Sequence, residues 1–376
     1  MTKIIEIFNV VKSFIQSPQS VEKYRTSAKY FTRKSELTFE KTIYLMLCNF
    51  HNNLSVELTN TLIHSDLHIV TASAFRQRRY QIKHVFFDDL NDLFIESWFD
   101  PSQTDIKTWK GFRLQGVDGS KLTLPNNPAV REAFGTQIGG SKSVQTTTPM
   151  GLLLCQYDLL NKLIIKSTFG GLSIGEPTVM KGWLDSIKQG VLSVFDRGFF
   201  SYLLCYMMLE KKKDFVMRVK VNANKTIQDF VLSGKKEEIL TFNHCEKQIF
   251  GDTVVPSQTN IIVRAIRVEL KGGITEILIT SLLDQQLYTI EDFNYVYALR
   301  WGIETCYDCL KNKLYLMCFT GVKPEAIRQE ISATIVAHNL HQIIANEAQK
   351  EVTERVKKKT KRLKRNIHQQ KLLIIS

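Results

Sequence analysis

Three acidic residues, far apart in the sequence, occupy positions where carboxylates commonly do chemistry. Asp118 follows an alternating segment at 112–117 that predicts a strand, and Asp196 follows a short apolar strand predicted at 191–195. In open α/β sheets, functional groups collect at the carboxyl ends of strands. The third acid, Glu304, lies in a segment whose periodicity predicts a helix from about 290 to 313.

Four residues of this predicted helix share one face. At about 100° per residue, the side chains in one narrow stripe are those of Tyr297, Arg300, Glu304 and Lys311. A polar stripe is often only the solvent face of a helix. This one combines a carboxylate with two cations and a phenol, and it accompanies two aspartates at predicted strand ends, so we treat it as a candidate site.

The combination suits phosphodiester chemistry. Two magnesium ions about 3.5 to 4 Å apart can activate an attacking oxygen and stabilise a departing one. Hard cations of this kind prefer carboxylate oxygens, and three acidic side chains from separate segments can hold such a pair. The neighbouring arginine and lysine are suited to holding substrate phosphates.

With their flanking residues, these motifs resemble a known family. The motifs are Gly116-Val-Asp-Gly-Ser-Lys121, Phe195-Asp-Arg-Gly-Phe-Phe-Ser201 and Tyr297-x2-Arg300-x3-Glu304-x6-Lys311. They resemble those of bacterial insertion-sequence DDE transposases of the cut-and-paste type that carry the Tyr-Arg-Glu-Lys (YREK) signature, over about residues 73–313. The resemblance implies an α/β fold: a ribonuclease-H-like catalytic core interrupted by a β-rich insertion, with an N-terminal helical domain.

The resemblance also implies roles and partners. The catalytic residues and ligands of two Mg²⁺ or Mn²⁺ ions would be Asp118, Asp196 and Glu304. The contacts to DNA phosphates at the element ends would come from Tyr297, Arg300 and Lys311. The implied activity is metal-dependent cleavage at the element ends and strand transfer into target DNA. The implied partners are double-stranded DNA, as inverted-repeat ends and as target, and a second copy of the chain in a synaptic homodimer.

Two other functions remain open at this point. A metal-dependent nuclease with the same core would cut DNA without joining it. A catalytically inactive remnant would bind DNA without cutting. The intact set of three carboxylates argues against the remnant, and a strand-transfer assay separates the nuclease from the transposase.

Changes in periodicity divide the chain into regions. We expect an N-terminal helical, DNA-binding region at 1–105, a catalytic core at 106–221 and 280–347, a β-rich insertion at 222–279 and a basic C-terminal tail at 348–376. Relatives typically use a tryptophan of the insertion to stack on a flipped base. This insertion has none, but one of its aromatic residues, Phe230, Phe242 or Phe250, could take this role, because stacking tolerates any aromatic type. We assign Trp301, in the signature helix, to core packing.

The positive charge is unevenly distributed. The chain carries a formal charge of +13, and residues 350–376 alone hold ten Lys and Arg against two Glu. A run of this kind at 356–365 would neutralise phosphates without reading sequence. The alternative is a solvated tail that only aids solubility.

A second basic region lies at 20–84. Within it, Thr71 is placed to cap a helix that carries Arg76, Arg78 and Arg79 and buries one apolar face. Such an arginine-rich helix could enter a DNA groove. It could equally be an ordinary surface helix with a charged face.

Composition excludes several classes of protein. The longest uncharged stretch, at 143–157, is interrupted by threonines and a proline, so no segment approaches the roughly 20 apolar residues of a membrane span. Seven cysteines without framework spacing favour a reducing compartment. We therefore expect a cytoplasmic protein, associated with the bacterial nucleoid through DNA and not with a membrane.

Overall fold

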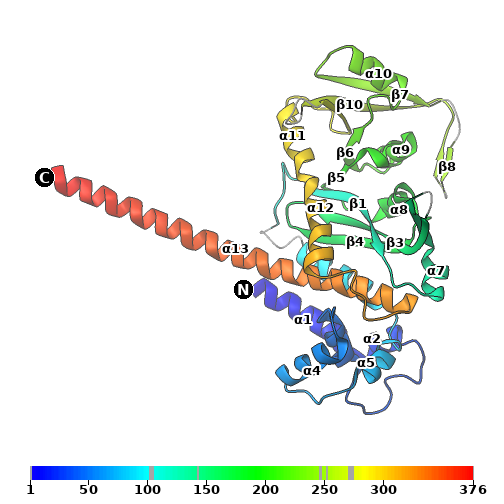
Figure 1. Cartoon of the computed structure of the whole chain (residues 1–376). Helices are drawn as coiled ribbons and strands as arrows, with labels where there is room; N and C mark the ends of the chain where they lie inside the picture. The colour runs from blue at the N-terminus through cyan, green and yellow to red at the C-terminus, as the bar shows by residue number, and fades with distance from the viewer. Residues whose placement is uncertain are drawn as a thin grey trace.

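The computed structural model describes residues 2–100, 106–141, 144–244, 248–250, 253–269 and 275–375. Figure 1 shows three tiers: N-terminal helices, a central sheet with its covering helices, and a smaller tier built around β7, β10 and α10. A single long helix, α13 (Pro324–Ile375), runs beneath the sheet and continues beyond the body of the protein. The predicted domain boundary at 105 falls outside the described residues.

The central tier is a mixed sheet. Its strands are β1 (Arg113–Thr123), β2 (Thr136–Ser141), β3 (Val144–Asp158), β4 (Leu163–Gly171), β5 (Val191–Phe195) and β6 (Asp214–Val219). Strand β1 is antiparallel to β3 and parallel to β5, β3 is antiparallel to β4, and β5 is parallel to β6. The order β4-β3-β1-β5-β6, with an antiparallel half followed by a parallel half, is ribonuclease-H-like, which confirms the predicted fold class.

The region predicted as a β-rich insertion extends this same sheet. It contains α10 (Lys225–Leu232), β7 (Glu237–His244), β8 (Gln248–Phe250), β9 (Thr253–Val255), β10 (Thr259–Glu269) and β11 (Thr275–Thr280). Strand β11 pairs antiparallel with β6, β10 pairs with β11, and β7 pairs with β10. Hydrogen bonding therefore runs without a break from the catalytic half into the inserted strands.

Two apolar layers cover the sheet. On one face Leu192 and Val194 pack with Ile303. On the other face Val191 and Phe195 join a second cluster. The helices of these layers are α7 (Pro128–Phe134), α8 (Glu176–Trp183), α9 (Tyr202–Glu210), α11 (Ile290–Leu299) and α12 (Trp301–Asp308), with short turns η1 (Leu184–Ser186), η2 (Arg197–Phe199) and η3 (Cys309–Lys313). Alternating burial along β5 thus fixes which helices lie on each face.

The helix predicted from 290 to 313 is divided. It begins at a capping box formed by Thr289 and Asp292, and α11 ends at Leu299. Arg300 stands between α11 and α12, and the last segment, η3, is a π-helical turn. Since a π turn advances by a smaller angle per residue than an α-helix, a stripe drawn at 100° per residue does not extend unchanged to Lys311.

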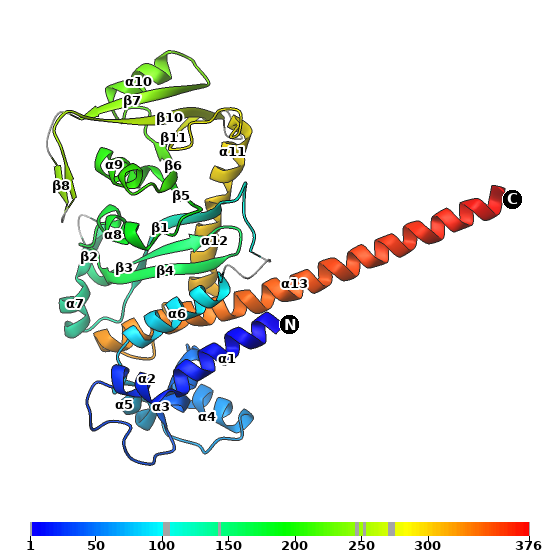
Figure 2. The same cartoon turned by 180° about the vertical axis from the view of Figure 1, so that it is seen from behind.

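The N-terminal tier packs on the first half of α13. Its helices are α1 (Thr2–Gln16), α2 (Pro18–Tyr24), α3 (Phe39–Leu47), α4 (Leu54–His64), α5 (Ala72–Arg79) and α6 (Val85–Trp98). They share one apolar cluster with Leu163 of β4 and with Ala333, Val336 and Ile343 of α13. We predicted that the catalytic core would end at 347 and that a separate basic tail would follow, but α13 continues without a break through the basic run at 356–365 to Ile375. Figures 1 and 2 both show its second half projecting away from the molecule.

None of the helices described combines the length and the apolar character that a membrane crossing requires.

Candidate active site

Strand register brings the two aspartates together. Val117 of β1 and Phe195 of β5 are direct partners in the parallel pair. Asp118 and Asp196 are the next residue on each strand, and neighbouring strands lie about 4.8 Å apart. Strand β5 ends at Phe195, whereas β1 continues to Thr123 in its pairing with β3, so Asp118 lies within its strand. The two carboxylates therefore leave the sheet side by side where the β1–β5 pairing stops.

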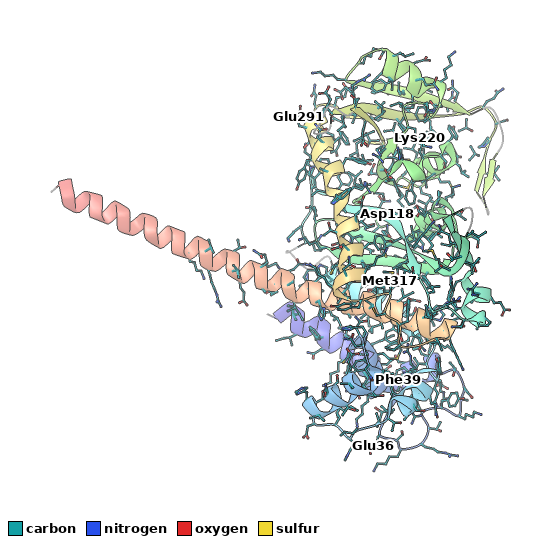
Figure 3. All side chains as sticks on the ribbon, viewed as in Figure 1. Glu36, Phe39, Asp118, Lys220, Glu291 and Met317 are labelled. Carbon is teal, nitrogen blue, oxygen red and sulfur yellow. The ribbon has the colours of Figure 1, made fainter. Side chains whose placement is uncertain are left out.

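Helix α12 carries the third carboxylate over this edge. The hydroxyl of Tyr307 donates to the backbone oxygen of Asp118 at 2.7 Å and to that of Leu153 at 3.0 Å. This fixes α12 against β1, with Glu304 one turn before the anchor. Figure 3 shows Asp118 in the middle of the molecule, beside this helix.

The charges at this edge act on Asp118. Burial raises the pKa of its carboxyl, and the nearby charges of Glu304 and Asp196 raise it further. The backbone N–H of Gly119, 2.9 Å from Oδ1, and the charge of Arg300 oppose these effects without cancelling them. The pKa of Asp118 is therefore raised, as expected of one member of a crowded carboxylate group.

Asp196 has the opposite balance. Burial again acts to raise its pKa, but the Arg197 backbone N–H and the charges of Arg218 and Arg300 outweigh it, so the pKa is lowered. Arg218 donates from Nε at 2.8 Å and lies 2.7 Å away through Nη2. The Tyr297 hydroxyl donates to the same carboxylate oxygen at 3.3 Å.

Sequence reasoning missed Arg218 and its second partner. Arg218 lies in β6 and also pairs with Glu276 of β11, the strand hydrogen-bonded to β6. Oε2 of Glu276 is buried and has no hydrogen-bond partner. The signal available in the sequence was one arginine inside an otherwise apolar run at 215–219 of this strand. Glu276, which lies in the predicted insertion, therefore pairs with Arg218, and Arg218 in turn pairs with Asp196.

The signature residues are placed unequally. Arg300 donates from Nη2 to Glu304 at 2.7 Å, so these two residues form an ion pair four positions apart on the helix. Lys311 is half-buried, and burial lowers its pKa. No hydrogen bond or ion pair described here joins Lys311 to the three carboxylates. The site thus gathers Tyr297 and Arg300 around the carboxylates, but the predicted stripe does not carry Lys311 into these contacts.

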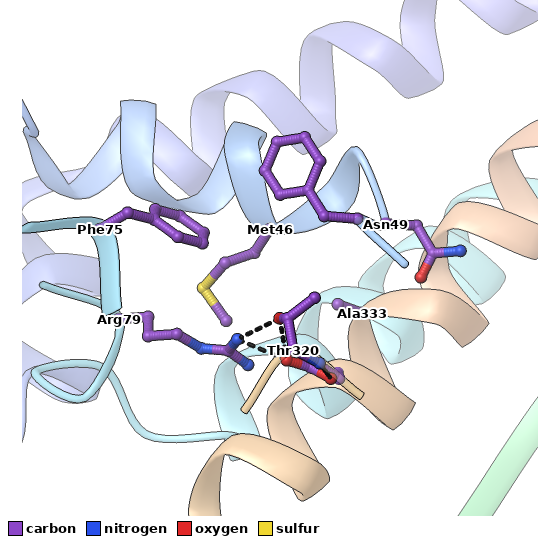
Figure 4. Close-up of a pocket in the computed structure, with 8 residues that line it drawn as sticks. Met46, Asn49, Phe75, Arg79, Thr320 and Ala333 are labelled. Carbon is purple, nitrogen blue, oxygen red and sulfur yellow. Dashed lines mark hydrogen bonds and ion pairs between the residues drawn. The ribbon is translucent and has the colours of Figure 1, made fainter. Parts of the chain in front are cut away.

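One N-terminal arginine was assigned wrongly to DNA contact. Arg79 is 1% exposed. Its guanidinium donates to Gln329, Thr320, Glu330 and the backbone oxygen of Ala326, as the close-up in Figure 4 shows in part. With its donors satisfied inside the protein, it is not available to DNA.

The other two arginines of this helix differ from Arg79. The side chain of Thr71 caps α5 by accepting from the Ala74 N–H at 3.1 Å, as predicted, and Arg76 is exposed in the last turn of the helix. Arg78 is half-buried; it donates to Gln81 at 3.0 Å and lies over the ring of Phe31. Of the three arginines, Arg76 is the most exposed, Arg78 is partly exposed and Arg79 is buried.

The aromatic residues also differ from expectation. Phe230 and Phe242 are each 2% exposed, so neither can stack on a flipped base without leaving the core. The side chain of Phe250 lies outside the described residues. Trp301, which we assigned to core packing, is 64% exposed. The reason is the break at Arg300, which starts α12 at Trp301 and leaves Ile303 and Tyr307 to pack inward.

The donor types at this edge fit divalent cations. Asp118, Asp196 and Glu304 supply only carboxylate oxygens, which Mg²⁺ and Mn²⁺ prefer, and burial together with the charges of Glu304 and Asp196 raises the pKa of Asp118. Within the described part of the chain, no three His, Cys, Asp or Glu side chains gather closely enough to hold one metal ion. Asp196 and Glu304 are instead paired with Arg218 and Arg300.

Comparisons with known proteins complete the description. A sequence comparison with curated proteins finds no match. Among solved structures, the chain is similar to one described as a cryo-EM structure of piggyBac transposase synaptic complex with hairpin DNA. The identity is 12%, the TM-score is 0.47, and the alignment covers 91% of this chain and 76% of the other. The family model described as Transposase DDE domain matches residues 112–340, a span that contains all three carboxylates and the complete Tyr-Arg-Glu-Lys signature. The chain therefore belongs to the DDE transposase family.

Proposed function

We propose that this protein is a cut-and-paste DNA transposase of the Tyr-Arg-Glu-Lys class, encoded by a bacterial insertion sequence. It cleaves DNA at the element ends and joins those ends to target DNA. The observation that carries the proposal is the edge where Asp118 and Asp196 follow the paired residues Val117 and Phe195, with Glu304 acting electrostatically on Asp118.

Asp118, Asp196 and Glu304 are the residues that would hold two divalent cations. When bound, such a pair activates the attacking oxygen and stabilises the leaving oxygen of a phosphodiester. The protein's contribution is to keep three carboxylates on a rigid strand pair and a helix anchored to it by Tyr307. Arg218 and Tyr297 orient Asp196, and Arg300 orients Glu304.

DNA is the proposed substrate. Arg300 lies beside the carboxylates, donates to Glu304 from one nitrogen, and can exchange this contact for a bidentate contact to a phosphate. Lys311, on the same helical segment, and Tyr297 are the further proposed phosphate contacts. The exposed ring of Trp301 supports a role in stacking against a base. Arg76, Arg78 and the basic half of α13 are proposed to bind the flanking duplex.

A second copy of the chain is proposed as a partner, because joining two element ends to one target requires two catalytic sites. We propose that the protein acts on DNA in the bacterial cytoplasm. Both proposals follow from the proposed reaction.

The test is an in vitro reaction of the full chain with DNA carrying the element's own inverted repeats, read from the flanking sequence. With Mg²⁺ or Mn²⁺, labelled ends are expected to be cleaved and then to appear covalently joined to a target plasmid. Chelation by EDTA should stop both steps. Asp196→Asn is the matched variant, because it removes a ligand charge while preserving side-chain size.

The two alternatives give different products in this reaction. A nuclease of the same core would yield cleaved ends with no joined product. A binding remnant would shift labelled ends on a gel without cleaving them under any metal condition. Either result would replace the proposed function.

A further inference from the structure

A fourth carboxylate lies against the candidate site. Glu176 is the first residue of α8, and its side chain rests on Gly119, the residue after Asp118. A Cβ atom added to Gly119 would lie 2.2 Å from Oε1 and 2.7 Å from Cδ of Glu176. No side chain other than hydrogen at position 119 leaves room for the glutamate in this position.

The three atoms nearest to a Cβ placed on Gly119 all belong to the side chain of Glu176. Glycine within a strand weakens the strand, and it often marks a place where another group approaches the backbone closely. The backbone of Gly119 is not in the left-handed region, so its conformation does not require glycine. What requires glycine here is the side chain of Glu176.

A simple helix-capping role does not account for this placement. A glutamate in the first turn of a helix is stabilised by the helix dipole even when it points to water. Glu176 is instead half-buried; burial raises its pKa, and the charges of Asp118 and Asp196 raise it further. Bringing a carboxylate towards like charges costs free energy unless a cation is also present.

The distribution of counter-charges indicates where such a cation belongs. Asp196 is paired with Arg218, and Glu304 with Arg300. Among the ion pairs of the described residues, none includes Asp118 or Glu176. The two carboxylates without a basic partner are thus the two that flank Gly119.

We propose that Glu176 is a fourth carboxylate of the divalent-cation site, acting beside Asp118, and that Gly119 is the residue that admits it. The inference rests on the proposed function, in which Asp118, Asp196 and Glu304 hold two cations. It adds a ligand from α8, an element that carries none of the family motifs.

The test measures Mn²⁺ binding to the full-length protein by calorimetry and by electron paramagnetic resonance of the bound ion, in the absence of DNA. We expect Glu176→Gln to weaken binding by about tenfold or more. Gly119→Ala should give a similar loss, because the added methyl displaces the glutamate. The double variant should be no weaker than either single variant, since both changes remove the same interaction.

Two control variants match these changes. Gly182→Ala adds a methyl to α8 at a position where nothing lies within 4 Å. Glu210→Gln neutralises an exposed glutamate outside the site. Both should bind Mn²⁺ like the unmodified chain, and all variants should keep its thermal unfolding midpoint to within a few degrees.

The outcomes separate this inference from the proposed function. If Asp196→Asn abolishes Mn²⁺ binding while Glu176→Gln leaves it unchanged, Glu176 is not a ligand and the proposed function stands. If Gly119→Ala weakens binding and Glu176→Gln does not, Gly119 acts through the strand and the inference is overturned. If the unmodified chain binds no Mn²⁺, or Asp196→Asn binds it normally, both the inference and the metal-dependent function fail.

Discussion

Two arginines, Arg79 and Arg300, show how differently one side chain can be used in this molecule. Arg79 connects α5 to the start of α13, is 1% exposed, and donates to four different residues. Arg300 stands between α11 and α12, its side chain is 11% exposed, and it donates to Glu304. Both form an ion pair with a glutamate, at 2.5 Å and 2.7 Å respectively.

The difference lies in what each arginine can still bind. The guanidinium of Arg79 is enclosed, so its charge and hydrogen bonds serve the contact between the N-terminal helices and α13. The side chain of Arg300 is also largely buried, but it donates to Glu304 from a single nitrogen, Nη2, and the side chain of Glu304 is 35% exposed. The ion pair of Arg79 therefore braces two elements, whereas that of Arg300 is an exchangeable contact, and the number of donors already engaged by the protein decides which.

The largest effect is expected on DNA cleavage, from a change at the candidate active site. Glu304→Gln should reduce end cleavage by more than about a thousandfold, or about 4 kcal/mol of transition-state free energy, because it removes a ligand charge. DNA binding, measured by gel shift, should change little, since affinity comes chiefly from phosphate contacts elsewhere. A variant that lost binding and cleavage together would make Glu304 a structural residue like Glu330.

The enclosed arginine should matter for stability instead. Arg79→Ala leaves Glu330 half-buried without its partner, so we expect the free energy of unfolding to fall by about 3 to 5 kcal/mol in urea titrations. Arg76→Ala, on the same helix but exposed, is the control and should stay within about 0.5 kcal/mol. Equal effects of the two variants would contradict the assignment of Arg79 as a brace.

The exposed arginine of α5 tests recognition of DNA. If Arg76 reads a base edge, Arg76→Ala should reduce the preference for element ends over random DNA by about 1 to 3 kcal/mol. Deleting residues 356–376 should instead weaken binding to element ends and to random DNA alike, and it should make the salt dependence of binding shallower. Competition binding at two salt concentrations measures both. Equal loss for both DNAs in Arg76→Ala would make α5 a phosphate clamp.

The smallest effect is expected for the pH dependence of stability, through the buried carboxylate of Asp158. Burial raises the pKa of Asp158 to about 6, against hydrogen bonds from Asn161 and the charge of Arg113. One carboxylate oxygen is buried with no partner. Because the folded-state pKa is raised, the group contributes stability below its unfolded pKa of about 3.9, and this is lost as pH rises through 6.

Asp158→Asn keeps an acceptor for the backbone N–H of Asn161 and removes the charge. The stability of the variant relative to the unmodified chain should therefore rise by about 1 kcal/mol between pH 5 and pH 7.5, measured by urea unfolding at both values. A pH-independent difference would show that Asp158 ionises in the folded protein as readily as in water.

Much of this architecture is present in local sequence. The strand Val191–Phe195 consists of five buried residues, and alternating residues face opposite apolar layers. The cap at Thr71 and the start of α8 at Glu176 need only neighbouring residues. Such features are predictable because periodicity and capping act over a few residues. For the same reason, Asp118 and Asp196 could be placed at one sheet edge from the motifs that contain them.

What the tertiary structure decided are the contacts between distant segments. Three of the partners of Arg79 lie about 250 positions away on α13, and Glu276 lies 58 positions from Arg218. How whole elements pack also decides three other features. These are the exposure of Trp301, the pairing of the inserted strand β11 with β6, and the contact of Glu176 with Gly119. A local pattern specifies which face of an element is apolar, but the partner of a polar side chain is fixed only when packing brings two elements together. The sequence by itself therefore identified Asp118, Asp196 and Glu304 as a candidate carboxylate group. Only the folded chain determined which arginines pair with two of them and that Glu176 lies close by.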